Sequence, residues 1–325
     1  EAANCPNRAE LATRRRRPAA RRNRGRALAV NGSIDLGSGK LSLTVLSVMK
    51  GLTLTERPRK SSYAIELSGR GGKTLARYPI EPKPGSDLPA GSEVAAIDEV
   101  VRFAKGTRRV TVLEGKKTLR SVAVSANAPR VRVLAPKGKG KLGKRTTVRW
   151  KATDRDRDDL TYSLLYSPDR EADFLPVAAG LRSRSYRADL RRLPGGKRAR
   201  FRVVANDGVL TGTASSRGKL QVKAKKPRVH VTAPATGASF NEGEPLQLAA
   251  TVDDLQDATI PARRIVWRSD RSGEIGRGSA VAAVLAPGAH TVTVTATNSS
   301  GRRASRSIEI SVVATPPTID GDDPG

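Results

Sequence analysis

Four aspartates within six residues are the strongest candidates for chemistry in this chain. They are Asp154, Asp156, Asp158 and Asp159. Ca²⁺ prefers six to eight oxygen ligands, and alternating carboxylates in a loop can supply roughly three or four of them. Backbone carbonyls and Asp207, from an Asn-Asp-Gly turn, could add others. The alternative is a set of surface ion pairs, because Arg155 and Arg157 separate the acids and no glycine supplies a tight turn.

A second pattern is basic and predicts a surface for polyanions. If Ala199, Phe201 and Val203 face inward, the residues between them face outward, because side chains alternate along a strand. Lysines of the last strand of the same module could lie beside them and bind phosphates or an acidic polymer through charge alone. The predicted polyanion-binding residues are Arg198, Arg200, Arg202, Lys219 and Lys223. The alternative is solvated charge that discourages edge pairing.

The charge of the chain is unevenly distributed. The formal net charge is +29, to which residues 1–26 contribute +7, 27–128 contribute +7, 129–225 contribute +16 and 226–325 contribute −1. A uniform compositional bias would have charged the last segment too, so the asymmetry favours an anionic partner. Aromatic residues make up only 3% of the chain, which argues against base stacking and therefore against nucleic acid.

No catalytic constellation accompanies these patterns. The sequence has no His-Glu-x-x-His, no Gly-x-Ser-x-Gly and no phosphate-cradling loop. We expect His290 to bond nearby backbone at a strand corner and His230 to point outward. Cys5 is the single cysteine, so neither an intrachain disulfide nor a cysteine-based metal site is expected. No apolar run approaches the ~18 residues of a membrane span.

The elements that position these residues are predicted to be short strands. Residues 147–152 alternate polar and apolar side chains, and residues 160–166 resume the alternation, which predicts a strand–loop–strand corner around the aspartates. Residues 63–78 and 110–124 each indicate a hairpin around a turn. Only residues 97–105, IDEVVRFAK, have helical character. A second acidic corner, with Asp253, Asp254 and Asp257, is a weaker Ca²⁺ candidate.

An internal repeat divides the chain. Residues 129–136, PRVRVLAP, and 227–234, PRVHVTAP, match at six of eight positions, 98 residues apart. A spacing near ~100 residues is the size of one immunoglobulin-like sandwich. We therefore predict an all-β fold of three tandem immunoglobulin-like β-sandwiches behind a disordered basic N-terminal arm. The predicted divisions are an arm at 1–26, modules at 27–128, 129–225 and 226–314, and a linker or tail at 315–325.

The second predicted module resembles a fibronectin type III domain. That family places a tryptophan on its second strand, a tyrosine on its third, and a Leu-x-Pro-Gly-like turn before a strand that ends near an alanine. The matching residues here are Trp150, Tyr166, 193–195 and 201–205. Ala199 stands where the family has its corner tyrosine, and the Asp-x-Asp-Gly-Asp loop usual at the acidic corner, which would suit a cation, lacks its glycine. The resemblance covers roughly a third of the chain and implies a fold.

The third predicted module is similar to PKD domains, immunoglobulin-like repeats common in secreted bacterial proteins. The similarity rests on residues 287–301, PGAHTVTVTATNSSG, which match the last strands of that family. The usual Trp-x-Phe-Gly-Asp-Gly stretch is replaced by residues 267–273, WRSDRSG. The order of the three modules resembles the C-terminal ends of large secreted bacterial proteins, some of which resemble peptidases farther upstream.

The resemblance implies a secreted, extracellular or cell-surface array without catalysis, which spaces, docks or adheres. Its expected partners are an anionic cell-surface polymer or another protein, and an upstream domain of the same polypeptide, because we expect the chain to begin upstream of Glu1. Two alternatives stay open. One is the C-terminal accessory region of a secreted hydrolase such as a peptidase, with its catalytic domain upstream. The other is nonspecific nucleic-acid binding by the basic arm and the second module.

Overall fold

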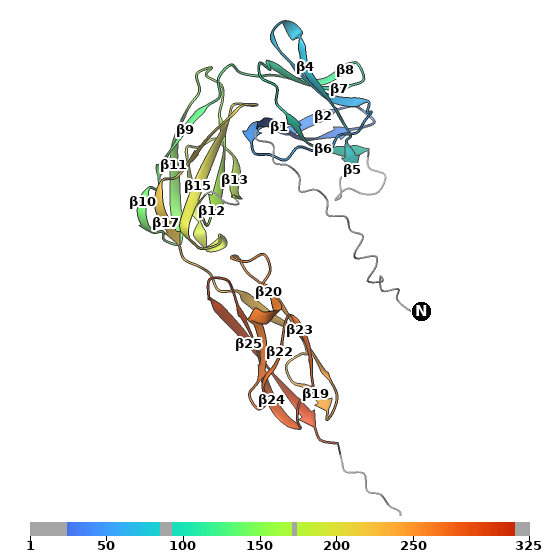
Figure 1. Ribbon diagram of the computed structural model, residues 1–325, viewed down its shortest axis with the longest axis vertical. Coiled ribbons are helices and arrows are strands. Elements are labelled where there is room, and N and C mark those ends of the chain that lie inside the picture. The colour runs from blue at the N-terminus through green and yellow to red at the C-terminus, as the bar shows by residue number, and fades with distance from the viewer. Residues whose placement is uncertain (1–24, 85–92, 171–173, 316–325) are drawn as a thin grey trace, which may run out of the picture.

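The computed structural model describes residues 25–84, 93–170 and 174–315 (Figure 1). In these residues the regular structure is β-strand, interrupted by three short 3-10 turns and by no α-helix. Six sheets pair into three sandwiches in chain order, which confirms the predicted all-β fold of immunoglobulin-like modules. The predicted disordered arm, with Cys5, lies outside the described residues except for its last two positions, and the tail lies outside them from residue 316 onward.

The first module packs two four-stranded sheets. Its strands are β1 (Arg26–Asp35), β2 (Leu41–Lys50), β3 (Tyr63–Ser68), β4 (Thr74–Ile80), β5 (Lys83–Pro84), β6 (Val94–Arg102), β7 (Arg109–Glu114) and β8 (Lys117–Ala123), with η1 (Arg70–Gly72) between β3 and β4. The sheets have the strand orders β2-β1-β6-β5 and β4-β3-β7-β8. Both predicted hairpins are confirmed, because β3 pairs with β4 and β7 with β8.

The predicted helical character of residues 97–105 is wrong, because most of this segment lies in strand β6. β6 pairs antiparallel with β1, and every second residue from Ala95 to Val101 is buried. The alternation was hidden in the sequence because Glu99 stands on the inward face. The Thr55 hydroxyl donates a hydrogen bond to its carboxylate at 2.6 Å, which compensates its burial.

The second and third modules share one topology in all strands but one, as expected of a repeat. The second contains β9 (Arg130–Ala135), β10 (Gly138–Lys141), β11 (Arg145–Thr153), β12 (Thr161–Ser167), β13 (Leu175–Leu181), β14 (Ser185–Asp189), η2 (Leu190–Arg192), β15 (Gly196–Asn206), β16 (Thr211–Ser215) and β17 (Gly218–Val222). The third contains β18 (Arg228–Ala233), β19 (Ala238–Asn241), β20 (Leu246–Asp253), η3 (Ala262–Arg264), β21 (Ile265–Ser269), β22 (Gly273–Arg277), β23 (Ala280–Ala283), β24 (Gly288–Thr297) and β25 (Arg303–Val313).

Each of these two modules packs a small sheet on a larger one. The small sheets are β14-β11-β9 and β18-β20-β23, and the larger ones follow the paths β10-β17-β15-β12-β13 and β19-β25-β24-β21-β22. In both modules the short second strand pairs parallel with the last strand. The shared path means that equivalent loops of the two modules can be compared directly.

The cores explain the alternation seen in the sequence. In the second module Trp150 packs edge-on against Tyr162, with ring centroids 5.4 Å apart. In the third module His290 is buried, as expected of a corner residue, and its Nε2 lies 2.7 Å from the carbonyl oxygen of Ala286. Nε2–H therefore donates to that carbonyl, and Nδ1 accepts from the Ser269 hydroxyl at 2.8 Å. His290 thus has a structural role.

Candidate functional site

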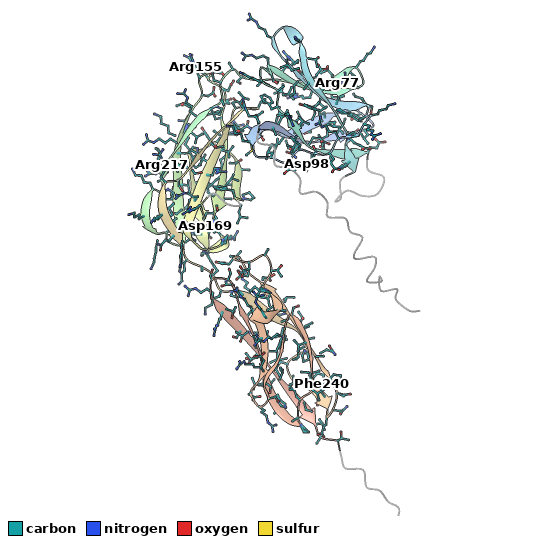
Figure 2. All side chains as sticks on the ribbon, viewed as in Figure 1. Arg77, Asp98, Arg155, Asp169, Arg217 and Phe240 are labelled. Carbon is teal, nitrogen blue, oxygen red and sulfur yellow. The ribbon has the colours of Figure 1, made fainter. Side chains whose placement is uncertain are left out.

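The acidic loop lies between β11 and β12, at the end of the second module that faces the first. Arg155, inside the loop, marks this end, and Asp169 lies at the opposite end, near the third module (Figure 2). Carboxylate oxygens of Asp154, Asp156 and Asp158 lie within 4.8 Å of one another. The structure therefore brings three of the predicted metal ligands together, and Asp159 stands outside this group.

Most of the loop's hydrogen bonds hold the segment that links the first two modules. Asn127 donates to both carboxylate oxygens of Asp156, from its Nδ2 at 2.7 Å and from its backbone N–H at 2.6 Å. The Ser125 hydroxyl donates to Asp158 Oδ2 at 2.5 Å. The hydrogen bonds from Asn127 hold the pKa of the Asp156 carboxyl below its ordinary value. The acidic loop thus anchors the segment that links the first two modules.

Two carboxylate oxygens near this loop have no hydrogen-bond partner in the described part of the chain. Asp154 Oδ1 and Asp207 Oδ1 each accept two backbone N–H groups of their own loops. The Oδ2 atoms of both residues are buried and lack a hydrogen-bond partner among the described residues. Burial raises the pKa of the Asp207 carboxyl, and the negative charges of Asp158 and Asp154 raise it further. A proton or a cation would offset the energetic cost of burying these two unpartnered oxygens.

The fit to Ca²⁺ is partial. The two unpartnered oxygens favour a cation, but the linker occupies both oxygens of Asp156 and one of Asp158. Ca²⁺ prefers roughly six to eight oxygens, so carbonyls and water would have to complete the shell. The glycine that the loop lacks is replaced by Arg157, which takes the left-handed conformation itself with φ of 65°. The Ca²⁺ site therefore stays a prediction.

The turn that carries Asp207 joins the first two modules. Val209 and Leu210, 2% and 5% exposed, belong to the apolar core of the first module. Val48 of β2 donates its backbone N–H to the carbonyl of Val209 at 2.8 Å, and the Thr211 hydroxyl donates to the carbonyl of Val48 at 2.5 Å. At this first joint, residues of the second module therefore extend both the sheet of β2 and the apolar core of the first module.

The joint between the second and third modules is polar. Gln256 Oε1 accepts the backbone N–H groups of Gly195 and Lys225, each at 2.9 Å. The Asp257 carboxylate accepts the backbone N–H of Ser299 at 2.7 Å within the third module. The acidic corner of this module, the weaker Ca²⁺ candidate, is thus bonded mainly to backbone groups around the joint.

One substitution separates the two corners chemically. Asn298 follows β24 as Asp207 follows β15. Its Nδ2 donates to Asp254 Oδ2 at 2.9 Å and to the carbonyl of Lys225 at 2.9 Å. Asp254 therefore has the partner that Asp154 lacks, because the third module places an amide where the second places a carboxylate.

The predicted polyanion-binding arginines lie on the outer face of β15. The inward residues of this strand are fully buried, so the arginines between them point away from the core. Two of them have local partners: Arg200 Nη1 donates to the carbonyl of Gly218, and the Arg202 guanidinium lies 3.8 Å from the centroid of the Phe174 ring. The other three predicted residues are exposed: Arg198, Lys219 and Lys223.

Two further lysines complete this surface and were missed in the sequence. β10 pairs parallel with β17, which sets Lys139 beside Lys219 and Lys141 beside Gln221. The alternation of lysine and glycine over residues 137–141 carried the signal, because residues two apart share a face of a strand. We call the following five exposed residues the basic face: Lys139, Lys141, Arg198, Lys219 and Lys223.

The described part of the chain contains no helix long and apolar enough to cross a membrane. No protein-family model and no curated protein matches the sequence. Among solved structures, the fibronectin(III)-like modules of Clostridium thermocellum CbhA match with 18% identity over 57% of this chain and 94% of that chain, at a TM-score of 0.25.

The N-terminal four Ig domains of Dscam1 isoform 6.9 match with 11% identity over 77% of this chain and 65% of that chain, at a TM-score of 0.31. Titin A168169 matches with 13% identity over 57% of this chain and all of that chain, at a TM-score of 0.30. The strand order and pairing of the chain itself define it as an array of tandem immunoglobulin-like β-sandwich modules.

Proposed function

We propose that the chain is a non-catalytic extracellular array that docks on an anionic cell-surface polymer through the basic face. The observation that carries this proposal is the parallel pairing of β10 with β17, which sets Lys139 beside Lys219. Neighbouring strands lie ~4.8 Å apart, so the two ammonium groups would repel one another without anions between them. An extended polyanion supplies such anions along the whole sheet.

The electrostatics favour a polymer over a single anion. The five residues of the basic face are exposed, and none of them forms an ion pair within the described ranges. An exposed ion contact contributes only about 0.2–1 kcal/mol and is screened by salt. Useful affinity therefore requires many contacts made at once, which a chain of repeating negative groups provides.

No described acid of the second module forms an ion pair with the basic face. Asp154, Asp156 and Asp158 gather at the first joint, at the end of the module that faces the first module. Asp189 forms an ion pair with Arg191 at 2.5 Å in the η2 turn. Exposed lysines and arginines also lie on β9, β11 and β14, so the pairing of β10 with β17, and not charge alone, distinguishes the basic face.

Binding of inorganic polyphosphate to the full chain tests the proposal. At low salt we expect the pair Lys139→Glu and Lys219→Glu to weaken binding roughly tenfold, since two reversed contacts amount to about 1.4 kcal/mol. The matched control is Lys73→Glu with Arg120→Glu, two exposed residues of the first module. Equal loss in both pairs, or binding that does not weaken with salt, would contradict a specific basic face.

A further inference from the structure

Two hollows flank the segment that connects the second and third modules. The larger has a volume of about 1080 Å³ and the smaller about 960 Å³. They adjoin, because Leu142, Val222, Lys223, Ala224 and Arg302 line both. We call the two hollows together the joint trough.

The joint trough is strongly basic. Eight of the sixteen residues that line the larger hollow are Lys or Arg and two are Asp, and one of these, Asp254, already accepts a hydrogen bond from Asn298. Four of the thirteen residues that line the smaller hollow are basic and none is acidic. Lys225 is partly buried at the trough, and burial lowers the pKa of its ammonium group. The cations therefore outnumber the local carboxylates.

The joint trough is continuous with the basic face. Lys141 and Lys223 belong to the basic face and also line the smaller hollow. Lys144, three residues after Lys141, lines the larger hollow, and Arg302 brings a cation from the third module to both. A row of positive charge thus runs from the outer sheet of the second module, around the connecting segment, to the third module.

We propose that the joint trough is the second half of the polymer site. A phosphate-bearing polymer that lies on the basic face continues through the trough and reaches Arg302, so one ligand contacts two modules and fixes the angle between them. This inference rests on the proposed function. The second joint is suited to such control, because it is held by a few polar contacts to Gln256 and Asn298.

The lining of the trough selects a polymer without bases. No Phe, Tyr or Trp lines either hollow. Proteins that hold single-stranded nucleic acid stack its bases on aromatic side chains, which this trough lacks. Phosphate groups on a polyol or sugar backbone need only cations and backbone N–H groups. The expected occupant is therefore a phosphodiester or polyphosphate chain of the kind found in anionic surface polymers.

The test compares three double variants of the full chain. The trough variant is Lys144→Glu with Arg302→Glu, the face variant is Lys139→Glu with Lys219→Glu, and the control is Lys73→Glu with Arg120→Glu. The probes are long-chain inorganic polyphosphate, pyrophosphate, and an oligothymidylate with the same number of phosphates as the polyphosphate. Melting temperatures establish that each variant is folded.

We expect the trough variant to bind long polyphosphate roughly tenfold more weakly than the unmodified chain, with a salt slope lower by roughly one per lost contact. Its binding of pyrophosphate, which is too short to span both regions, should fall by less than its binding of long polyphosphate. Small-angle scattering should show that long polyphosphate narrows the distribution of dimensions of the unmodified chain and not of the trough variant.

The outcomes separate the two proposals. If the face variant loses affinity and the trough variant does not, the trough inference is overturned and the basic face stands. If neither variant loses affinity, or if the control loses as much as they do, both are overturned. Tighter binding of oligothymidylate than of polyphosphate would overturn the choice of a polymer without bases.

Discussion

The two joints of the chain are built from equivalent loops, but apolar burial holds the first joint and hydrogen bonds hold the second. At the first joint the turn after β15 reads DGVL and inserts Val209 and Leu210 into the neighbouring core. At the second joint the turn after β24 reads NSSG, has no apolar residue and holds the connecting segment through the amide of Asn298. A buried Val or Leu contributes about 1.5–3 kcal/mol, whereas one hydrogen bond contributes about 0.5–1.5 kcal/mol net.

This difference between the joints predicts that the first joint is more rigid than the second. The first joint couples two modules through shared sheet and core, so a change of angle would break apolar packing. The second joint keeps Leu255 43% exposed and leaves Gln256 Nε2 buried without a partner among the described residues. We therefore expect the first two modules to move as one unit and the third to reorient relative to them.

The largest effect should come from emptying the first joint. Leu210→Ala removes a side chain that is 5% exposed, and such truncations cost about 2–5 kcal/mol. The loss should fall on the first module, although the residue belongs to the second. Calorimetry that resolves the separate transitions measures it. The matched control is Leu255→Ala at the second joint, where the change should stay within ~0.5 kcal/mol; equal losses would refute the contrast between the joints.

A wedge at the second joint should have the next largest effect. A Cβ on Gly195 would collide with the backbone of Ala224 in the connecting segment, and crowding of this kind costs about 1–3 kcal/mol. Gly195→Ala should therefore change the scattering profile of the full chain while the melting of the first module stays the same. Gly143→Ala is the control, because its Cβ would meet no atom closer than 3.8 Å. An unchanged profile would show that Gly195 does not set the angle.

Exchanging carboxylate and amide between the two acidic corners tests whether the unpartnered oxygens destabilise the first joint. Asp207→Asn gives the first joint the amide that Asn298 supplies at the second, and one new hydrogen bond should add about 1 kcal/mol. Because the folded-state pKa of Asp207 is raised above 3.8, the wild-type penalty is full above that folded-state pKa. The gain should therefore be largest near neutral pH and vanish as the pH falls through that pKa toward 3.8. Chemical denaturation at several pH values measures it.

The reciprocal change and Ca²⁺ complete this test. Asn298→Asp should destabilise the third module by a similar amount. If the stability gained by Asp207→Asn did not depend on pH, the charge-based explanation would be contradicted. If Ca²⁺ occupies the first corner, millimolar Ca²⁺ should raise the melting temperature of the unmodified chain more than that of Asp207→Asn. Equal melting temperatures with Ca²⁺ and with a chelator would contradict the Ca²⁺ prediction.

The smallest effect concerns the acidic loop itself. Arg157 has φ of 65°, a conformation that costs an L-residue about 1–2 kcal/mol and glycine almost nothing. Arg157→Gly should gain roughly 0.5 kcal/mol once the greater freedom of glycine in the unfolded chain is counted. Thermal unfolding measures this gain, and Arg155→Gly, outside the left-handed region, should lose stability instead.

Local rules made the fold predictable and left the joints unpredictable. Alternation along β11, β12 and β15 identified inward residues because it depends only on strand geometry. Glu99 defeated the same rule, since its burial depends on a hydroxyl 44 residues away. The burial of Val209 and Leu210 could not be predicted from local sequence, because the core that buries them belongs to another module. Lys139 was missed because its neighbour Lys219 is set by a long-range parallel pairing.

The insertion of Val209 and Leu210 also sets an order of events during synthesis. Leu210 leaves the ribosome 87 residues after Ala123, the last residue of β8. At ~5–20 residues per second this interval is roughly 4–17 s. During that time the first module has all its own strands but lacks the two side chains that complete its core. Its surface around β2 therefore stays an exposed apolar edge until the second module is almost finished.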